Sequence, residues 1–506
     1  MKKTILVIAL LFCLKSQLAA QNNCLPGNLY NNNNWLDGFG SIAGLDNGDY
    51  IAGGSSFNSS NNYRQMFLVR IDACGNDIWK QGYGDTTEYF SNVILHHQPG
   101  DNFFVATALH YSNIIQWYTY TLIKFNLAGE MLWMRKYWAG PQKSSPKSVV
   151  QTSDGGFAIV GFNQNFANDY SKIWFLKTDG EGNIEWDKFY GTNNNSERVY
   201  QIIQLPDDGY LILGYRSYPD APTLKTWLIR TDAQGNILWE RLHGNNFATY
   251  GVCIIPIPDG YMISGIQYAA PTWQIAGDAY LLKTDINGYM QWQRTYGGQY
   301  SEQISKIMQL PDGNYMCMGS NASWGTVGST DGWLFKVSAV GDSIWSKTYC
   351  YDTLVAMYEY FYDFTTAPDG GFMIGGFAVR PAPTNQDAWI VRTDSLGNAC
   401  PPYNGCWAVG TEQTPPFFEG GQGGEQVVVY PNPAGNTLFI NATHLTAAHV
   451  LTISLYTPQG QLAKQHTAPG GATLQLATDT LPSGIYYCHI QVNGHAPQTQ
   501  KIAVIR

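Results

Sequence analysis

The sequence predicts an all-β protein: a seven-bladed β-propeller with four strands per blade, followed by a small antiparallel β-sandwich. Three observations lead to this fold class. The 506 residues include 33 Tyr, 22 Phe, 16 Trp and 53 Gly but only 13% charged residues, which favours short strands joined by tight turns. One motif recurs about every 53 residues from the N-terminal region to about residue 401. A Pro- and Gly-rich stretch then precedes a segment with a different pattern.

The recurring motif is centred on a tryptophan. The spacing between successive copies is 53 or 54 residues, at Trp79, Trp133, Trp186, Trp239, Trp292 and Trp345. The phrase is clearest in WFLKTDGEGNIEW (174–186) and WLIRTDAQGNILW (227–239), and a seventh copy (389–401) has Pro401 in place of the tryptophan. Alternating segments at 199–205, 210–215, 227–231 and 237–242 predict four strands in one repeat, the size of a propeller blade. We expect the tryptophan to fill the space between blades and the Asp-x-x-Gly before it to form a turn.

The last repeat lacks its fourth strand, and the residues before the first repeat can supply it. Residues 24–34 end in a Tyr-Asn segment similar to the one that follows Trp186. Pairing of this kind would close the ring and remove its free edges. It would also bring Cys24 near Cys400 or Cys406 for a disulfide, although a local Cys400–Cys406 bridge remains an open alternative. Three other cysteines lie in apolar strand patterns and are expected to be buried free thiols: Cys253, Cys317 and Cys488.

The N-terminus has the pattern of a secretory signal peptide, predicted over residues 1–20. Lys2 and Lys3 precede an apolar stretch at 5–14, and small residues precede a cut at Gln21. No other apolar run is long enough for a membrane span. The net charge of −9 and the pI near 5.4 argue against a nucleic-acid partner. The propeller is therefore expected over 21–406 of an exported chain.

Residues 407–426 have the composition of a flexible linker, and 427–506 alternate as a small Ig-like sandwich of six or seven strands. The motif residues are Tyr430, Pro431, Asn432, Pro433, Gly460, Gly484, Tyr486 and Lys501. This segment resembles the type A C-terminal sorting domain of type IX secretion cargo in the Bacteroidota, and the propeller repeat is similar to repeats of exported proteins from that phylum. The resemblance implies recognition by the secretion machinery, removal by a sortase-like peptidase, and a final location at the cell surface, anchored to the outer membrane, or in the medium. An adhesive Ig-like module is the alternative.

No catalytic motif is present, and no cofactor or structural metal site is expected. Four acidic residues recur thirteen positions before the aromatic that follows the first turn of each repeat: Asp37, Glu197, Glu302 and Glu359. At the start of the innermost strands they would surround one mouth of the channel and bind a cation or a sugar, or offer paired carboxylates for glycoside chemistry. Carboxylates that cap neighbouring loops are the favoured alternative. Repeated Asp-Gly pairs suggest calcium, but a role in hairpin turns is favoured for them also.

Aromatic residues outside the repeated motif are the other candidates for binding. They fall in or beside the variable loops between second and third strands: Trp117, Tyr118, Tyr218, Trp273 and Trp324. Loops on a rigid scaffold commonly carry binding sites, and exposed aromatics stack on sugar faces, although core packing would explain at least half of this set. We predict a non-catalytic binding protein for extracellular polysaccharide or protein ligands. A polysaccharide hydrolase or lyase and a structural surface-layer protein are the alternatives.

Overall fold

The computed structural model describes 27–30, 36–58, 63–73, 75–84, 88–112, 118–140, 143–164, 170–192, 195–218, 221–244, 247–268, 276–324, 329–350, 358–379, 386–399, 428–430, 437–441, 450–457, 461–469, 472–482, 484–492 and 498–504. The chain divides into two compact units, residues 1–409 and 410–506. All the regular elements in the described residues are β-strands. No α-helix capable of crossing a bilayer occurs in the described part of the chain.

The first unit is built from antiparallel sheets of four strands, which we call blades. Alternating residues and short turns make each blade a consecutive meander. The first three contain β2 (Leu36–Gly44), β3 (Tyr50–Asn58), β4 (Tyr63–Ile71) and β5 (Asp77–Tyr83); β6 (Glu88–His96), β7 (Phe103–Ser112), β8 (Tyr118–Asn126) and β9 (Met131–Tyr137); and β10 (Lys143–Gln151), β11 (Phe157–Gln164), β12 (Ser171–Thr178) and β13 (Ile184–Tyr190).

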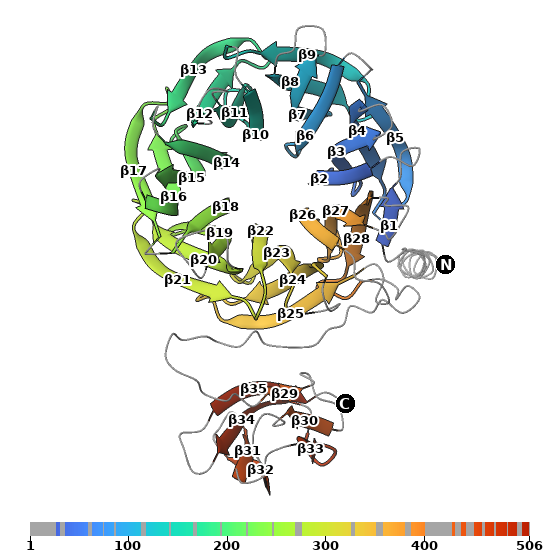
Figure 1. The fold of residues 1–506 in the computed structure, drawn as a ribbon. Coiled ribbons are helices and arrows are strands. Elements are labelled where there is room, and N and C mark those ends of the chain that lie inside the picture. The colour runs from blue at the N-terminus through green and yellow to red at the C-terminus, as the bar shows by residue number, and fades with distance from the viewer. Residues whose placement is uncertain are drawn as a thin grey trace, which may run out of the picture. The chain divides into compact units, whose positions relative to one another are not determined.

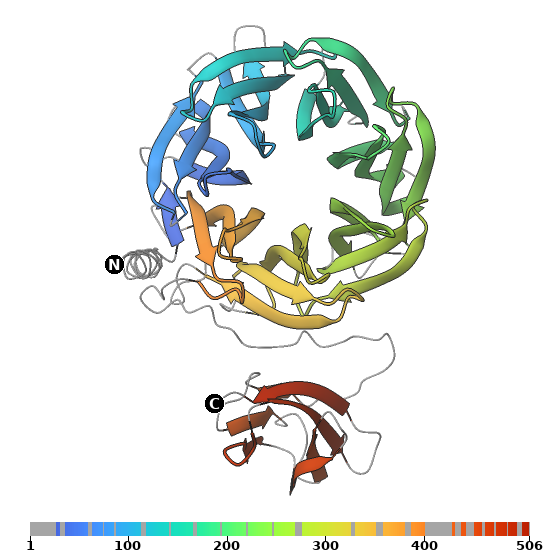
Figure 2. The same cartoon turned by 180° about the vertical axis from the view of Figure 1, so that it is seen from behind.

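The following blades repeat this order. They contain β14 (Ser196–Gln204), β15 (Tyr210–Tyr218), β16 (Ala221–Thr231) and β17 (Ile237–His243); β18 (Thr249–Ile257), β19 (Gly260–Tyr268), β20 (Gly277–Asp285) and β21 (Met290–Tyr296); and β22 (Glu302–Gln309), β23 (Tyr315–Asn321), β24 (Asp331–Val337) and β25 (Ser343–Tyr349). A single parallel bridge between Ser171 and Ser196 links the blades β10–β13 and β14–β17 into one eight-stranded sheet. Figures 1 and 2 show the blades around a central opening, each with its first strand innermost and its fourth at the circumference. The first unit is therefore a β-propeller.

The N-terminal strand completes the last blade. The strands β26 (Tyr358–Thr366), β27 (Phe372–Val379) and β28 (Gln386–Thr393) pair in order, and β1 (Gly27–Tyr30) pairs antiparallel with β28. The expectation that the N-terminal segment supplies this fourth strand is confirmed. Cys24, Cys400 and Cys406 lie outside the described residues, so the disulfide stays a prediction.

On most outer strands, a tryptophan and a tyrosine hold neighbouring blades together. The Trp186 ring lies against the turn of the next blade, where a Cβ added at Gly235 would lie 2.9 Å from it. Four residues later, the Tyr190 hydroxyl donates to the Gly235 carbonyl at 2.7 Å. The same Tyr–Gly bond recurs at Tyr83–Gly129, Tyr137–Gly182, Tyr296–Gly341 and Tyr349–Gly397. Tyr30 of β1 makes it to Gly75 at 2.5 Å, so the junction with the last blade uses the same contact. The expected role of the tryptophan between blades is confirmed.

The turn that receives these aromatics is built by its own aspartate and glycine. Asp232 Oδ1 accepts hydrogen bonds from the backbone amides of Gln234 (3.0 Å) and Asn236 (2.7 Å). Gly235 has a φ of 73°, a left-handed conformation that strains most other residues. With no side chain, Gly235 also leaves the space that the tryptophan ring occupies. The turn and the blade contact therefore depend on the same residue.

The second unit is a sandwich of two antiparallel sheets. One contains β29 (Val428–Tyr430), β30 (Thr437–Asn441) and β33 (Thr473–Ala477), and the other contains β31 (Val450–Tyr456), β32 (Leu462–Pro469), β34 (Gly484–Val492) and β35 (Gln498–Val504). Buried residues of both sheets form one core, including Leu438, Leu476, Ile453 and Ile490. The predicted small antiparallel sandwich is present.

Candidate functional site

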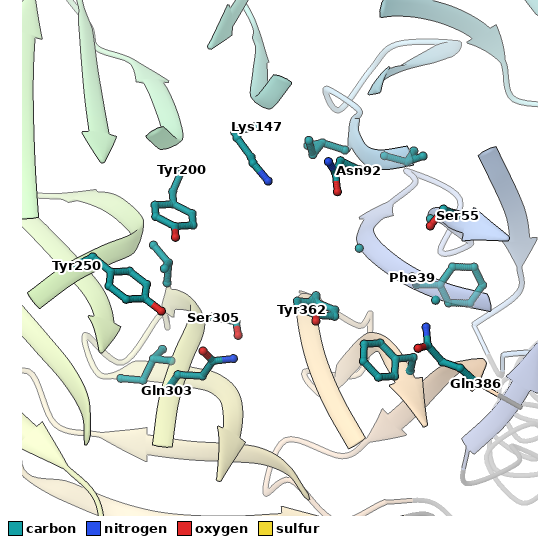
Figure 3. Close-up of a pocket in the computed structure, with 18 residues that line it drawn as sticks. Phe39, Ser55, Asn92, Lys147, Tyr200, Tyr250, Gln303, Ser305, Tyr362 and Gln386 are labelled. Carbon is teal, nitrogen blue, oxygen red and sulfur yellow. The ribbon is translucent and has the colours of Figure 1, made fainter. Parts of the chain in front are cut away.

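A cavity of about 560 Å³ lies at the centre of the propeller. Its walls come mainly from the first strands of the blades, so residues that are hundreds of positions apart in sequence meet there. This volume is within the range of about 300–1,000 Å³ that small-molecule sites occupy. Figure 3 shows the polar and aromatic side chains that surround it. The cavity is the candidate site.

A β-bulge interrupts the first strand of every blade where that strand meets the cavity. In β10 the pairing with β11 skips one residue between Pro146 and Ser148, and in β14 the pairing with β15 skips one between Val199 and Gln201. A bulge leaves the extra residue outside the ladder and redirects its side chain. In β6 the pairing skips both Asn92 and Val93. We take one bulged residue from each first strand and call this set the bulge ring: Gly40, Asn92, Lys147, Tyr200, Val252, Ser305 and Tyr362.

Tyrosines form one side of the cavity wall. The rings of Tyr200 and Tyr250 stack with their centroids 5.8 Å apart and an angle of 12° between their planes. Tyr215 supports both, with its centroid 6.2 Å from Tyr200 and 5.7 Å from Tyr250. Burial raises the pKa of Tyr200 and Tyr250, so both hydroxyls stay protonated and can donate hydrogen bonds. On another blade, the half-exposed Tyr362 packs 5.8 Å from Phe377.

Uncharged polar groups line much of the rest of the cavity. Gln303, Ser305 and Ser55 contribute an amide and two hydroxyls. The Gln386 amide nitrogen donates to the Asp37 carbonyl at 3.0 Å, which holds that side chain in place. The Asn92 amide nitrogen donates to Ser145 Oγ at 3.2 Å, and Asn92 itself has a φ of 53°. Amides and hydroxyls held in this way can exchange hydrogen bonds with the hydroxyl groups of a ligand.

One charged side chain lines the cavity among the residues that the structure describes. Lys147 projects from the bulge of β10 toward the centre (Figure 3). Burial lowers its pKa, and the nearby cations Arg198 and Lys143 lower it further. Lys306, one residue beyond Ser305 in β22, is instead ion-paired with Asp363. That carboxylate also accepts hydrogen bonds from Ser41 Oγ and the Ile42 amide, both at 3.0 Å.

The four recurring acids lie in the blades and not on the cavity wall. Asp37, Glu197, Glu302 and Glu359 are at most 1% exposed, and none of them lines the cavity. The acids therefore do not form the expected ring at the channel mouth. Adjacent residues face opposite sides of a strand, and the cavity is lined instead by the neighbours Gly38 and Gln303.

The favoured alternative for these acids, loop capping, is confirmed at two of them. Glu302 accepts from the amides of Gly298 (2.9 Å) and Ser323 (3.1 Å). Glu197 accepts from the Thr192 amide at 3.3 Å and lies 3.3 Å from Arg216 Nε. Burial raises the pKa of both carboxyl groups.

Two of the loop aromatics, Trp324 and Tyr118, do not line the cavity. Trp324 packs on the buried Trp333, with ring centroids 5.6 Å apart, and Tyr118 packs on Tyr111 at 4.6 Å. These contacts agree with the alternative of core packing. Tyr218 ends β15, and the structure describes only its backbone. Trp117 and Trp273 lie outside the described residues, so their role in binding stays a prediction.

The Asp-Gly turns have a structural explanation. A cation from the third strand pairs with an acid of the turn at Lys177–Asp154 (2.8 Å), Lys283–Asp259 (2.6 Å), Lys336–Asp312 (2.6 Å) and Arg392–Asp369 (2.6 Å). Among the described residues, no group of three or more His, Cys, Asp or Glu side chains could hold a metal ion. Cys253, Cys317 and Cys488 are buried free thiols, as expected. Calcium binding stays an untested prediction.

Part of the sorting motif lies on strands of the second unit. Tyr430 ends β29, Gly484 begins β34 and Lys501 lies in β35. Tyr486 is buried, and its hydroxyl donates to the Pro482 carbonyl at 3.0 Å, which ties β34 to the turn before it. Pro431, Asn432, Pro433 and Gly460 lie outside the described residues.

Comparison with known proteins identifies the second unit. Residues 428–505 match the family described as secretion system C-terminal sorting domain, of the type IX pathway. The chain is therefore exported, interacts with the type IX machinery, and is attached to the cell surface or secreted. A search of curated proteins found no match.

Solved structures similar to the chain include other propellers. The Dos1 propeller is 10% identical, with 72% of this chain and 94% of that one covered and a TM-score of 0.42. The β-propeller domain of the Trilobed protease from Pyrococcus furiosus is 11% identical, with coverage of 71% and 95% and a TM-score of 0.41. A putative exo-β-1,3-galactanase from Bifidobacterium bifidum is 14% identical, with coverage of 53% and 94% and a TM-score of 0.33. Likeness at this level carries no functional argument, and the propeller assignment depends on the strand pairing.

Proposed function

We propose that this exported chain is a non-catalytic binding protein whose propeller recognises an extracellular polysaccharide in its central cavity. The bulge ring is the observation that carries the proposal. Every first strand departs from regular pairing at a residue that lines the cavity, and bulges that re-aim a side chain are common beside functional sites. A rigid ring of strands holds these side chains before any ligand arrives, which lowers the entropy cost of binding.

The chemistry of the cavity wall supports a sugar ligand. Tyrosine rings offer flat apolar faces, and the amides of Gln303 and Gln386 and the hydroxyl of Ser305 offer donors and acceptors around them. Sugars present apolar faces edged by hydroxyl groups, so they match both kinds of surface. The described residues on the wall include no carboxylate, so the cavity favours binding over the alternative of paired-carboxylate glycoside hydrolysis.

We further infer seven blades. Five separate four-stranded sheets and the two halves of the eight-stranded sheet support this count, since 5 + 2 = 7. The same proposal includes calcium dependence and anchoring at the outer membrane after the sorting domain is removed. It also includes an origin in the Bacteroidota and the domain boundaries 21–406 and 427–506.

The test is binding of the purified full chain to a glycan array that also carries extracellular matrix proteins, with and without calcium. We expect binding to one class of glycan and a loss of at least about tenfold in affinity for Tyr250→Ala, because the stacked ring leaves the wall. Tyr289→Ala is the matched control, since Tyr289 is 58% exposed and does not line the cavity. Binding to proteins alone, or glycan binding that Tyr250→Ala leaves intact, would contradict the proposal.

A further inference from the structure

The cavity has the opposite charge to the protein that surrounds it. The chain carries a formal charge of −9, with 38 acidic and 29 basic residues. The described residues on the cavity wall nevertheless contain one lysine and no acid. A low-dielectric wall screens charge weakly, so one cation inside a cavity acts on a ligand more strongly than a cation on the open surface does.

Lys147 lies in surroundings that oppose its charge. Its ammonium group lies 5.9 Å from the centroid of the Phe162 ring, and the Arg198 guanidinium covers the same ring at 4.0 Å. Burial, Arg198 and Lys143 all favour the neutral form of this lysine, so its pKa is lowered. Among the described residues no carboxylate forms an ion pair with it, whereas Lys306 of the same inner layer has Asp363. A buried cation without a counter-charge is costly, and an anionic ligand in the cavity would remove that cost and favour the charged amine.

The neighbours of Lys147 indicate what carries that counter-charge. Figure 3 shows the Lys147 amine and the hydroxyls of Tyr200 and Tyr250 directed toward the same space. A sugar ring with an anionic substituent could pack against the tyrosines and place its charge at the amine. Gln303 and Ser305 lie on the blade that follows the blade of Tyr250, and their amide and hydroxyl suit the hydroxyl groups of a ligand.

We propose that the cavity selects saccharides that carry an anionic group on the sugar ring, a carboxylate or a sulfate, and that Lys147 is the residue that selects them. This inference rests on the proposed function and narrows it to acidic glycans. Lys147 acts by a charge-assisted hydrogen bond to the anion, while the tyrosines hold the ring.

The experiment compares three oligosaccharides of one length with the full chain: oligogalactose, oligogalacturonate and sulfated oligogalactose. Affinities are measured by calorimetry at low and high salt for the wild type, Lys147→Met, Lys147→Arg and Lys80→Met. Lys80 is an exposed lysine of the outer strand β5 and is the matched control. The unfolding midpoint of each variant is measured in parallel.

We expect the wild type to bind at least one acidic ligand about tenfold more tightly than the neutral one, with a preference that weakens at high salt. Lys147→Met should abolish the preference, Lys147→Arg should keep most of it, and Lys80→Met should not change it. The two acidic arms then identify the carboxylate or the sulfate as the recognised group. Equal binding of neutral and acidic ligands, or a preference that survives in Lys147→Met, would overturn the inference and leave the proposed function standing. Binding of none of the three oligosaccharides would count against both the acidic-glycan inference and the proposed function. Binding to another glycan on the array would then leave the proposed function standing, and a blank array would overturn it as well.

Discussion

Two regions of the propeller repeat once per blade: the junctions between neighbouring blades, and the bulge ring. At the junctions the same side chains are repeated, whereas in the bulge ring only the backbone irregularity is repeated. Between blades the side chains recur: a tryptophan and, four residues later, a tyrosine contact the turn glycine of the next blade. In the bulge ring only the backbone recurs, because the bulged residue is glycine, asparagine, lysine, tyrosine, valine or serine. A repeated blade contact and a varied cavity wall therefore share one scaffold.

The difference has a physical cause. The Trp186 ring and the Tyr190 hydroxyl both contact the backbone at Gly235. Because the turn backbone is the same from blade to blade, the same pair of side chains fits most junctions. Bulge-ring residues line a cavity and do not share one common contact: Tyr200 stacks on Tyr250, whereas Lys147 projects toward the centre. Their identity can therefore differ from blade to blade, which leaves them available for recognition. Four substitutions test this distinction.

The largest effect is expected for Trp186→Ala. The substitution removes a ring that packs on Gly235 and on Phe175, 4.8 Å away, and leaves a cavity between two blades. We expect a loss of about 3 kcal/mol in the free energy of unfolding. Denaturant midpoints, with slopes compared to check two-state behaviour, measure it. A change below about 1 kcal/mol would mean that the tryptophan contacts do not stabilise the junction.

Tyr190→Phe should have a smaller effect on the same junction. It keeps the ring but removes the hydroxyl that donates to the Gly235 carbonyl, so a buried acceptor loses its partner. We expect a loss of about 1.5 kcal/mol in the same denaturation experiment. Tyr362→Phe is the control, because its hydroxyl belongs to a half-exposed ring at the cavity. Equal losses in the two variants would erase the distinction between junction and cavity.

His243 stands where the other outer strands have the junction tyrosine, and it allows a pH test. Burial lowers the pKa of His243, with the Gly288 carbonyl acting in the opposite direction. The unfolded chain therefore takes up a proton below about pH 6.5 more readily than the folded one, and stability declines as the pH falls. His243→Tyr should remove this decline and raise stability by about 1 kcal/mol at pH 5. A gain of the same size at pH 5 and pH 8 would rule out titration of His243 as the cause.

The smallest effect on stability is expected for Lys147→Met. The aliphatic side chain can replace the lysine stem, and the substitution removes a cation that burial and Arg198 disfavour. The unfolding free energy should stay within about 0.5 kcal/mol of the wild type or increase slightly. A loss as large as that of Trp186→Ala would show that Lys147 supports the fold and would remove the basis for treating the bulge ring as separable from it.

Much of the fold could be predicted from the sequence, but the candidate site could not. The tryptophan period and the Asp-x-x-Gly turns are local patterns, and comparison of the repeats was enough to predict that the N-terminal strand completes the last blade. The cavity residues were missed, although a signal exists: Gly40, Tyr200, Ser305 and Tyr362 each lie three residues after one of the recurring acids. Counting thirteen positions back from the aromatic of each repeat selects acids such as Asp37 and Glu197, which are buried in the blades. Adjacent residues of a strand face opposite sides, so a count that is off by an odd number of residues selects the wrong face.

The sequence by itself determined the repeated parts of this protein, because each repeat contains its own hydrophobic alternation, turn residues and junction aromatics. The sorting domain was also determined locally, by motifs within residues 427–506. Only the tertiary structure decided which residues face the centre. A bulge shifts the register of one strand against its neighbour, and the spacing between repeats does not record that shift. Tyr200, Tyr250 and Lys147 become a single site only when their blades are placed around one ring.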